Sequence, residues 1–153
     1  MATLNDEIYF ASADGLSNWG EEDGLTSIYN RTSFLEGATD THFFFTGQLE
    51  DGSYSLFSHD GSDADPVALT VGSPFPTANG SVVGDAFYFV PTTSQELWQS
   101  DGTVVGTNRL QEIQHLSSVF GETEDQLLLG IDRPIGFIPV SYTHLTLPTI
   151  YSV

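Results

Sequence analysis

Short apolar runs alternate with turn-forming residues along the whole chain, and no stretch of useful length carries apolar residues at helical spacing. Four apolar triplets stand out: Ile8-Tyr9-Phe10, Phe43-Phe44-Phe45, Phe87-Tyr88-Phe89 and Leu127-Leu128-Leu129. Their first residues lie 35, 44 and 40 residues apart. This spacing predicts a tandem β-repeat.

Each triplet follows a short apolar pair across a turn of acidic, Gly or Asn residues, which is the pattern of a β-hairpin. The four turns are Asn5-Asp6, Glu36-Gly37, Gly84-Asp85 and Gly121-Glu122. We therefore expect four hairpins of one design, centred on residues 5, 37, 84 and 122.

An aromatic residue and then Asp-Gly follow each of the first three triplets. These are Trp19 with Asp23-Gly24, Phe57 with Asp60-Gly61, and Trp98 with Asp101-Gly102. Asp hydrogen-bonds its own turn and Gly tolerates positive φ, so each pair predicts a tight connection between strands. A further strand-like segment follows each pair, at 27–29, 67–69 and 109–113.

Four short strands in about 40 residues are typical of a propeller blade. The predicted fold is all-β and β-propeller-like, with units at about 1–32, 33–80, 81–117 and 118–138. A small sheet cannot bury both faces alone, so neighbouring units must stack, with Trp98 and Phe57 between them. Propellers close with about four to eight blades, so about three and a half units predict a partial array.

Charge and composition exclude several functions. The 153 residues include 21 acidic side chains, three arginines and no lysine, for a formal net charge of -18. Binding to nucleic acid or to an anionic membrane surface needs clustered basic residues, so neither partner is expected. Cysteine is absent, which excludes disulfides and thiolate chemistry. We expect no membrane insertion, because no apolar run reaches about 18 residues, and the start lacks the features of a signal peptide.

Residues 96–107, ELWQSDGTVVGT, resemble the signature of the bacterial ELWxxDGT repeat family. The matching positions are Glu96, Leu97, Trp98, Asp101, Gly102, Thr103, Gly106 and Thr107. The resemblance covers roughly residues 1–138, although Phe57 replaces Trp and Ser62 replaces Thr in the second unit. Physically, Trp98 is expected to be a wedge between blades, Asp101-Gly102 a turn, and Thr103 and Thr107 turn-closing hydroxyls.

The resemblance implies a propeller-like tandem array in a large secreted or surface-exposed bacterial protein, with no catalytic residues to assign. The expected function is thus a non-catalytic repeat scaffold or binding module. Further repeats of the same chain are its expected neighbours, and a protein or carbohydrate ligand is left open. The alternative is a fragment of a catalytic propeller acting on polysaccharide, of glycosidase or lyase type, with carboxylates drawn from several blades.

One loop offers a candidate metal site, and no other cofactor is expected. Asp60, Asp63 and Asp65 place three carboxylates within six residues, as a Ca²⁺ site requires. Their spacing departs from that of a calcium loop, and a solvated turn is the alternative. The other acidic clusters, 21–23 and 122–125, are interpreted as solvated loops.

The C-terminal segment, 139–153, continues no repeat. Its residues 139–149, PVSYTHLTLPT, resemble the translation of a sequencing-library adapter. We interpret the segment as a non-native tail and exclude it from the fold. The alternative is a genuine edge strand, because Val140, Tyr142 and Leu145 are strand-prone residues.

Overall fold

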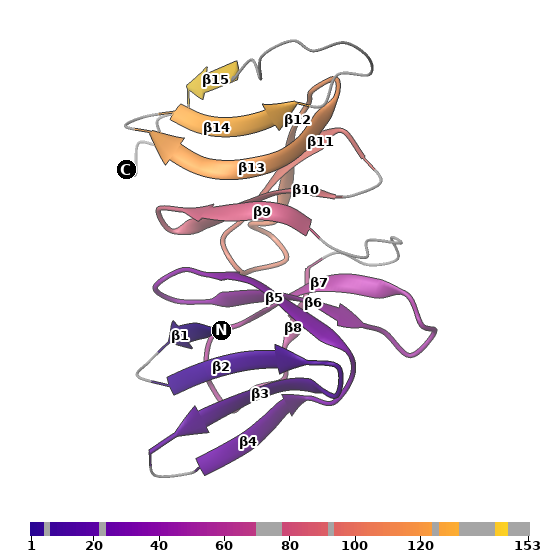
Figure 1. The fold of residues 1–153 in the computed structure, drawn as a ribbon, viewed down its shortest axis with the longest axis vertical. Helices are drawn as coiled ribbons and strands as arrows, with labels where there is room; N and C mark the ends of the chain where they lie inside the picture. Colours follow the sequence, from indigo (N-terminus) through magenta and orange to yellow (C-terminus); the bar gives the residue numbers. More distant parts are fainter. Residues whose placement is uncertain are drawn as a thin grey trace.

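The computed structural model describes residues 1–4, 7–21, 24–69, 78–91, 94–123, 126–131 and 143–146. All regular elements of these residues are β-strands, in four antiparallel sheets that succeed one another along the long axis (Figure 1). Sheet A comprises β1 (Ala2–Leu4), β2 (Glu7–Ser12), β3 (Gly15–Gly20) and β4 (Gly24–Tyr29). Sheet B comprises β5 (Ser33–Ala38), β6 (Phe43–Gln48), β7 (Tyr54–His59) and β8 (Val67–Ala68).

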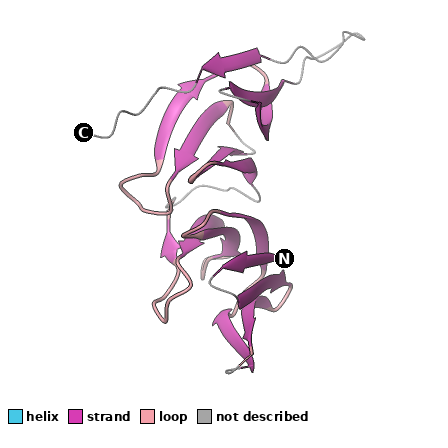
Figure 2. Cartoon of the chain, turned by 90° about the vertical axis from the view of Figure 1, so that its left-hand side faces the viewer, coloured by secondary structure: helices cyan, strands magenta, loops and turns pink. Residues whose placement is uncertain are grey.

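Sheet C comprises β9 (Ala78–Val83), β10 (Ala86–Pro91), β11 (Glu96–Ser100) and β12 (Asn108–Glu112). Sheet D comprises β13 (Leu116–Thr123), β14 (Gln126–Ile131) and β15 (Thr143–Thr146). The all-β prediction is confirmed, and sheets A, B and C are four-stranded meanders with their apolar triplets on the second strand. The sheets form an open stack that does not close into a ring (Figures 1 and 2).

No helix able to cross a membrane occurs within the described ranges.

Two of the predicted unit boundaries fall inside strands. β9 begins at Ala78, so the boundary between 80 and 81 divides it, and β13 begins at Leu116, before the boundary at 117. The first strand of a unit is longer than its apolar pair because polar residues continue the ladder. Asn79, for example, pairs with Val90. The boundary after residue 32 falls between strands, since β5 begins at Ser33.

One predicted hairpin turn is confirmed and two are wrong. Val83 pairs with Ala86 around the predicted turn at Gly84-Asp85. At Glu36-Gly37 the ladder of β5 and β6 instead contains a register shift, and it continues to the pair Ala38–Phe43. The Thr39 hydroxyl accepts a hydrogen bond from the His42 amide at 3.0 Å, which places the turn at residues 39–42.

Sheet D repeats this irregularity. The register of β13 and β14 shifts between Val119 and Gly121, and the ladder runs on to the pair Thr123–Gln126. The turn predicted at Gly121-Glu122 is therefore wrong, because those residues are in the strand. The pair Leu4–Glu7 brackets the first predicted turn, whose residues 5 and 6 lie outside the described residues.

The position of a residue in its triplet determines which neighbouring sheet it packs against. The middle residues face the following sheet: Tyr9 packs against sheet B, Phe44 against sheet C and Tyr88 against sheet D. The first and third residues face the preceding sheet. These are Phe43 and Phe45 toward sheet A, Phe87 and Phe89 toward sheet B, and Leu127 and Leu129 toward sheet C. Because strand side chains alternate between faces, one apolar triplet serves two junctions.

The aromatic rings make these junctions dense. Phe44 and Phe87 stack across the B–C junction with their ring centroids 4.9 Å apart, and both side chains are fully buried. Across the A–B junction, Tyr9 and Phe43 lie 4.3 Å apart. Sheets B and C, each covered on both faces, thus form the centre of the core.

The three aromatic landmarks occupy different environments. Phe57 is buried in the A–B cluster, as expected for a residue between sheets. Trp98 is only half-buried and packs at the margin of the B–C cluster beside Phe89, at 6.3 Å between ring centroids. Trp19 pairs with Ile8, the first residue of its triplet, whereas Trp98 pairs with Phe89, the third. Trp19 is therefore out of register with Trp98, and 46% of its surface is exposed.

Of the segment 139–153, the structure describes residues 143–146, which form β15 antiparallel to β14. This placement is the one that a genuine edge strand would take. That the segment is foreign to the protein stays a prediction.

Candidate functional site

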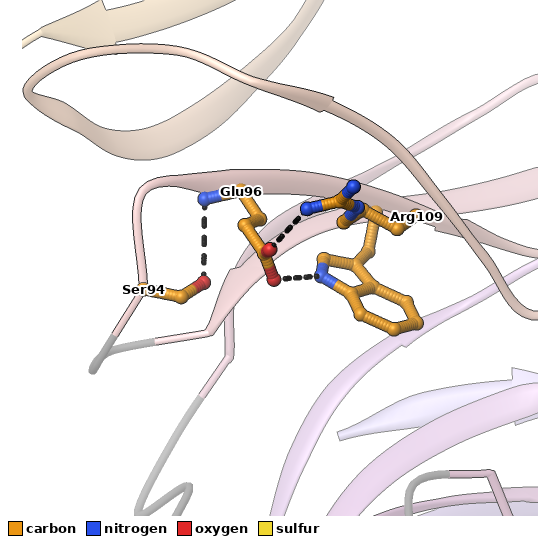
Figure 3. A network of polar contacts seen from close by, with 4 residues as sticks. Ser94, Glu96 and Arg109 are labelled. Atoms are coloured by element: carbon orange, nitrogen blue, oxygen red, sulfur yellow. Dashed lines mark hydrogen bonds and ion pairs between the residues drawn. The ribbon is translucent and has the colours of Figure 1, made fainter.

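The signature residues 96–107 comprise β11 and the loop that leads to β12. Glu96 organises the strand by three hydrogen bonds (Figure 3). Its carboxylate accepts from Trp98 Nε1 at 3.2 Å and from Arg109 Nη1 at 2.7 Å, and its amide donates to Ser94 Oγ at 3.3 Å. The hydrogen bonds from Arg109 and, to a lesser extent, from Trp98 lower the pKa of the Glu96 carboxyl. Glu96 and Trp98 are thus a local support for β11, and Leu97 is buried beneath them.

The loop after β11 closes on its own side chains. Asp101 Oδ1 accepts from both the amide and the hydroxyl of Thr103, each at 2.8 Å, and Gly102 adopts the predicted positive φ, at 96°. Thr103 Oγ1 accepts from the Gly106 amide at 2.9 Å, and the Thr107 hydroxyl donates to the Thr103 carbonyl at 2.6 Å. The hydroxyls of Thr103 and Thr107 therefore close the loop.

This loop also contacts the preceding sheet. The hydroxyl of Ser58, at the end of β7, donates a hydrogen bond to the Gly102 carbonyl. A Cβ atom at Gly102 would overlap the His42 ring in the turn between β5 and β6. Two features of this position thus require glycine: its positive φ and the close approach of the His42 ring. Neither partner is foreseeable from the sequence, because Ser58 lies 44 residues before Gly102.

The same Asp-Gly-Ser/Thr turn recurs twice in sheet B. Asp51 Oδ1 accepts from the Ser53 amide at 2.9 Å, and Asp60 Oδ1 accepts from the Ser62 amide at 3.0 Å. Hydrogen bonds from these serines lower the pKa of both carboxyls. For Asp101, burial raises the pKa, but the hydrogen bonds from Thr103 outweigh it, so the net shift is downward. The turns therefore favour ionised aspartates.

The Asp101 turn should be sensitive to acid. A carboxyl with a lowered pKa stabilises the fold above its ordinary pKa and loses that contribution as the pH falls through the lowered value. The Thr103→Val variant keeps the amide bond to Asp101 but loses the hydroxyl bond. We expect the pKa of Asp101 to rise toward its ordinary value in a carboxyl NMR titration. Thr3→Val, an exposed change of the same kind, should leave it unmoved; equal behaviour of the two variants would contradict the assignment.

A polar hollow of about 700 Å³ lies between sheets A and B. Its lining includes Glu7, Tyr9, Asn18 and Thr26 of sheet A, with His59 and the loop 61–65 of sheet B. Glu7 Oε2 accepts from the Tyr9 hydroxyl at 2.8 Å and from Asn18 Nδ2 at 2.6 Å. Burial, with Glu7 beside it, raises the pKa of Tyr9 well above its usual range. The pairing Tyr9–Asn18–Thr26 across three strands brings these side chains to one face.

His59 holds the other side of the hollow as a neutral imidazole. Its Nδ1 accepts from the Gly61 amide at 2.8 Å, so Nε2 carries the proton and donates to the Ala64 carbonyl at 3.0 Å. Burial lowers the pKa of His59, which maintains this neutral form. Stacking on Phe43, at 5.2 Å between ring centroids, fixes the ring plane. The imidazole therefore orders the loop 60–65.

Carboxylate acceptors are plentiful in the hollow, and several of its donors are engaged within the protein. The Tyr9 hydroxyl and the His59 Nε2 proton both have internal partners, and Asn18 Oδ1 is buried without one. Asp63 and Asp65 add exposed carboxylates at the rim. This arrangement suits a ligand that donates hydrogen bonds, such as one rich in hydroxyl groups. This hollow is not predicted by the sequence, in which its residues Glu7, Tyr9, Asn18 and His59 are marked only by their polarity on or beside apolar strands.

The candidate calcium loop forms part of this lining. Asp63 and Asp65 line the hollow, and Asp60 is engaged with Ser62. Within the described ranges, no three His, Asp or Glu side chains converge in a metal-binding group. Ca²⁺ binding by Asp60, Asp63 and Asp65 stays a prediction. Of the other acidic clusters, Glu22, Asp23, Glu124 and Asp125 lie outside the described residues.

Comparison of the chain with protein-family models, with curated proteins and with solved structures finds no match. The resemblance of residues 96–107 to the ELWxxDGT signature therefore stays a prediction.

Proposed function

We propose that the chain is a non-catalytic scaffold or binding module of a secreted or cell-surface bacterial protein, built as a propeller-like array of tandem repeats. One observation carries the proposal. At all three junctions, the first and third triplet residues of one sheet pack on the preceding sheet. They contact the face of that sheet that carries its middle triplet residue, called here the middle-residue face. A rule that holds for three successive junctions is typical of repeat proteins, in which each unit contacts only its neighbours.

The acidic surface supports an extracellular setting. A net charge of -18 spread over 153 residues produces strong self-repulsion. Salt or divalent cations in the surroundings screen that repulsion, with a Debye length of about 8 Å at physiological ionic strength. Together with the ELWxxDGT resemblance, this favours a secreted or surface location.

The hollow between sheets A and B is the proposed ligand site of the module. It is a concave region with hydrogen-bonding side chains on a packed support, since Tyr9 and His59 are buried and both rings contact Phe43. A carbohydrate offers hydroxyl groups that donate hydrogen bonds to the carboxylates of Glu7, Asp63 and Asp65. We therefore assign carbohydrate binding to this hollow in preference to a contact with another protein.

Incubation with a panel of soluble polysaccharides tests the proposal. We expect retardation by at least one polysaccharide in affinity electrophoresis and no new reducing ends. Asn18→Ala should weaken the retardation, because it removes the amide that holds the Glu7 carboxylate. Thr41→Ala, an exposed change in the turn at 39–42, is the matched control and should be neutral. New reducing ends that disappear in Glu7→Gln would instead favour the catalytic propeller, in which paired carboxylates cleave glycosidic bonds.

A further inference from the structure

The outer face of sheet A carries apolar side chains that none of the other sheets in the described part of the chain covers. Ile8, Trp19 and Leu25 pair across β2, β3 and β4 and so form one transverse row, with Phe10 beside it on the same face. The exposed fractions are 37% for Phe10, 46% for Trp19 and 67% for Leu25. The residues at the place of Phe10 in the other triplets, Phe45, Phe89 and Leu129, are at most 2% exposed.

The three internal junctions show what covers such a face. Ile8 and Phe10 are the first and third residues of their triplet, and in sheets B, C and D these positions pack on the middle-residue face of the preceding sheet. By the same rule, the surface that fits the outer face of sheet A is the middle-residue face of another sheet. A charged or polar partner would not match the row of Ile8, Trp19 and Leu25.

Sheet D presents such a face at the other end of the stack. Its middle triplet residue, Leu128, is half-buried, and among the described residues no further sheet follows sheet D. Phe120 stands out from the register shift of β13, is 61% exposed, and lies over Gly130, where a Cβ atom would meet its ring at 2.8 Å. Leu128 and Gly130 share one face, so Phe120 and Leu128 form an apolar surface together.

We propose that two copies of this chain associate head to tail, with the outer face of sheet A of one copy on the outer face of sheet D of the other. The contact repeats the internal junctions, since first and third triplet residues of one sheet again meet the middle residue of another. It joins two different surfaces and so leaves one of each free for further association or ring closure. The proposal rests on the repeat-array part of the proposed function.

The charge gives the association a diagnostic salt dependence. Each copy carries a net charge of -18, which opposes association at low ionic strength. The surfaces proposed to meet are apolar, so added salt screens the repulsion without removing the attraction. Association should therefore strengthen between low and physiological salt, the opposite of what an interface built on ion pairs would show.

Sedimentation velocity of the full chain, over a range of concentrations and at two salt levels, tests the proposal. Trp19→Ser removes the aromatic side chain from the sheet A surface, and Phe120→Ser removes the one from the sheet D surface. Each is an exposed position, and unchanged circular dichroism and melting temperature confirm that the variant folds. Each variant alone should lower the association constant at least about tenfold, the effect of losing an aromatic anchor. Val105→Ser, at an 89% exposed loop position, is the control and should change nothing.

Mixing the two variants gives the decisive result. The Trp19→Ser copy keeps an intact sheet D surface and the Phe120→Ser copy keeps an intact sheet A surface, so the mixture should form a 1:1 dimer and nothing larger. A monomeric wild-type chain would overturn the proposal, and so would association unaffected by either variant or a mixture that stays monomeric. None of these outcomes contradicts non-catalytic carbohydrate binding, which the polysaccharide panel tests separately.

Discussion

Phe87→Ala is expected to lower the free energy of unfolding by about 3–5 kcal/mol, the cost of removing a large aromatic side chain from a packed core. Phe87 is fully buried, stacks on Phe44 at 4.9 Å across the B–C junction, and lies 5.5 Å from Phe89 within its own sheet. The loss therefore combines the transfer term with a cavity between two sheets. Chemical denaturation followed by tryptophan fluorescence measures it.

Phe34→Ala provides the matched control for this core substitution. Phe34 is also a phenylalanine in a strand, but 48% of its surface is exposed. Its removal should cost less than about 1 kcal/mol, as for most surface substitutions. Equal costs for Phe34→Ala and Phe87→Ala would show that the B–C junction does not hold the sheets together.

Gly102→Val is expected to destabilise the fold by about 1–3 kcal/mol more than Gly84→Val, because it adds overpacking to backbone strain. Both glycines have positive φ, 96° for Gly102 and 57° for Gly84, so valine strains the backbone at each position. At Gly84 a Cβ atom meets nothing within 4 Å, whereas at Gly102 it overlaps the His42 ring. Thermal unfolding of the two variants isolates the contact with sheet B.

His42→Ala supplies the complementary test of that contact. Removing the ring should relieve part of the Gly102→Val penalty, so the two changes should be non-additive. Additive effects, or equal penalties at Gly84 and Gly102, would mean that the loop 101–107 does not dock on sheet B.

The repeat was predictable because its signals are local. Apolar triplets specify strands through alternation, and Asp-Gly pairs specify turns through side-chain hydrogen bonds and positive φ. Asp101 and Gly102 accordingly form the predicted turn. The turns predicted at residues 37 and 122 were wrong for a related reason. Glu36-Gly37 is a turn signal by composition, yet an irregular ladder also accommodates such residues.

The hollow was not predictable, because it depends on which sheet faces which. Glu7 and His59 approach one region only after sheets A and B stack, and no spacing in the sequence encodes that. Trp98 and Trp19 illustrate the same limit. Both pair with a first or third triplet residue and so face the side of the preceding sheet, but sheet B covers that side for Trp98 and no described sheet covers it for Trp19.

The central claim is that each triplet serves two junctions by strict alternation, and a cysteine pair tests it most directly. The chain has no cysteine, so introduced thiols have no competitors. A Cβ atom at Gly37 would lie 3.0 Å from Val82 Cγ2, within reach of a disulfide across the B–C junction. Val83, one residue further, packs toward sheet D. Gly37→Cys with Val82→Cys should form a disulfide on mild oxidation, and Gly37→Cys with Val83→Cys should not; the reverse result would contradict the account.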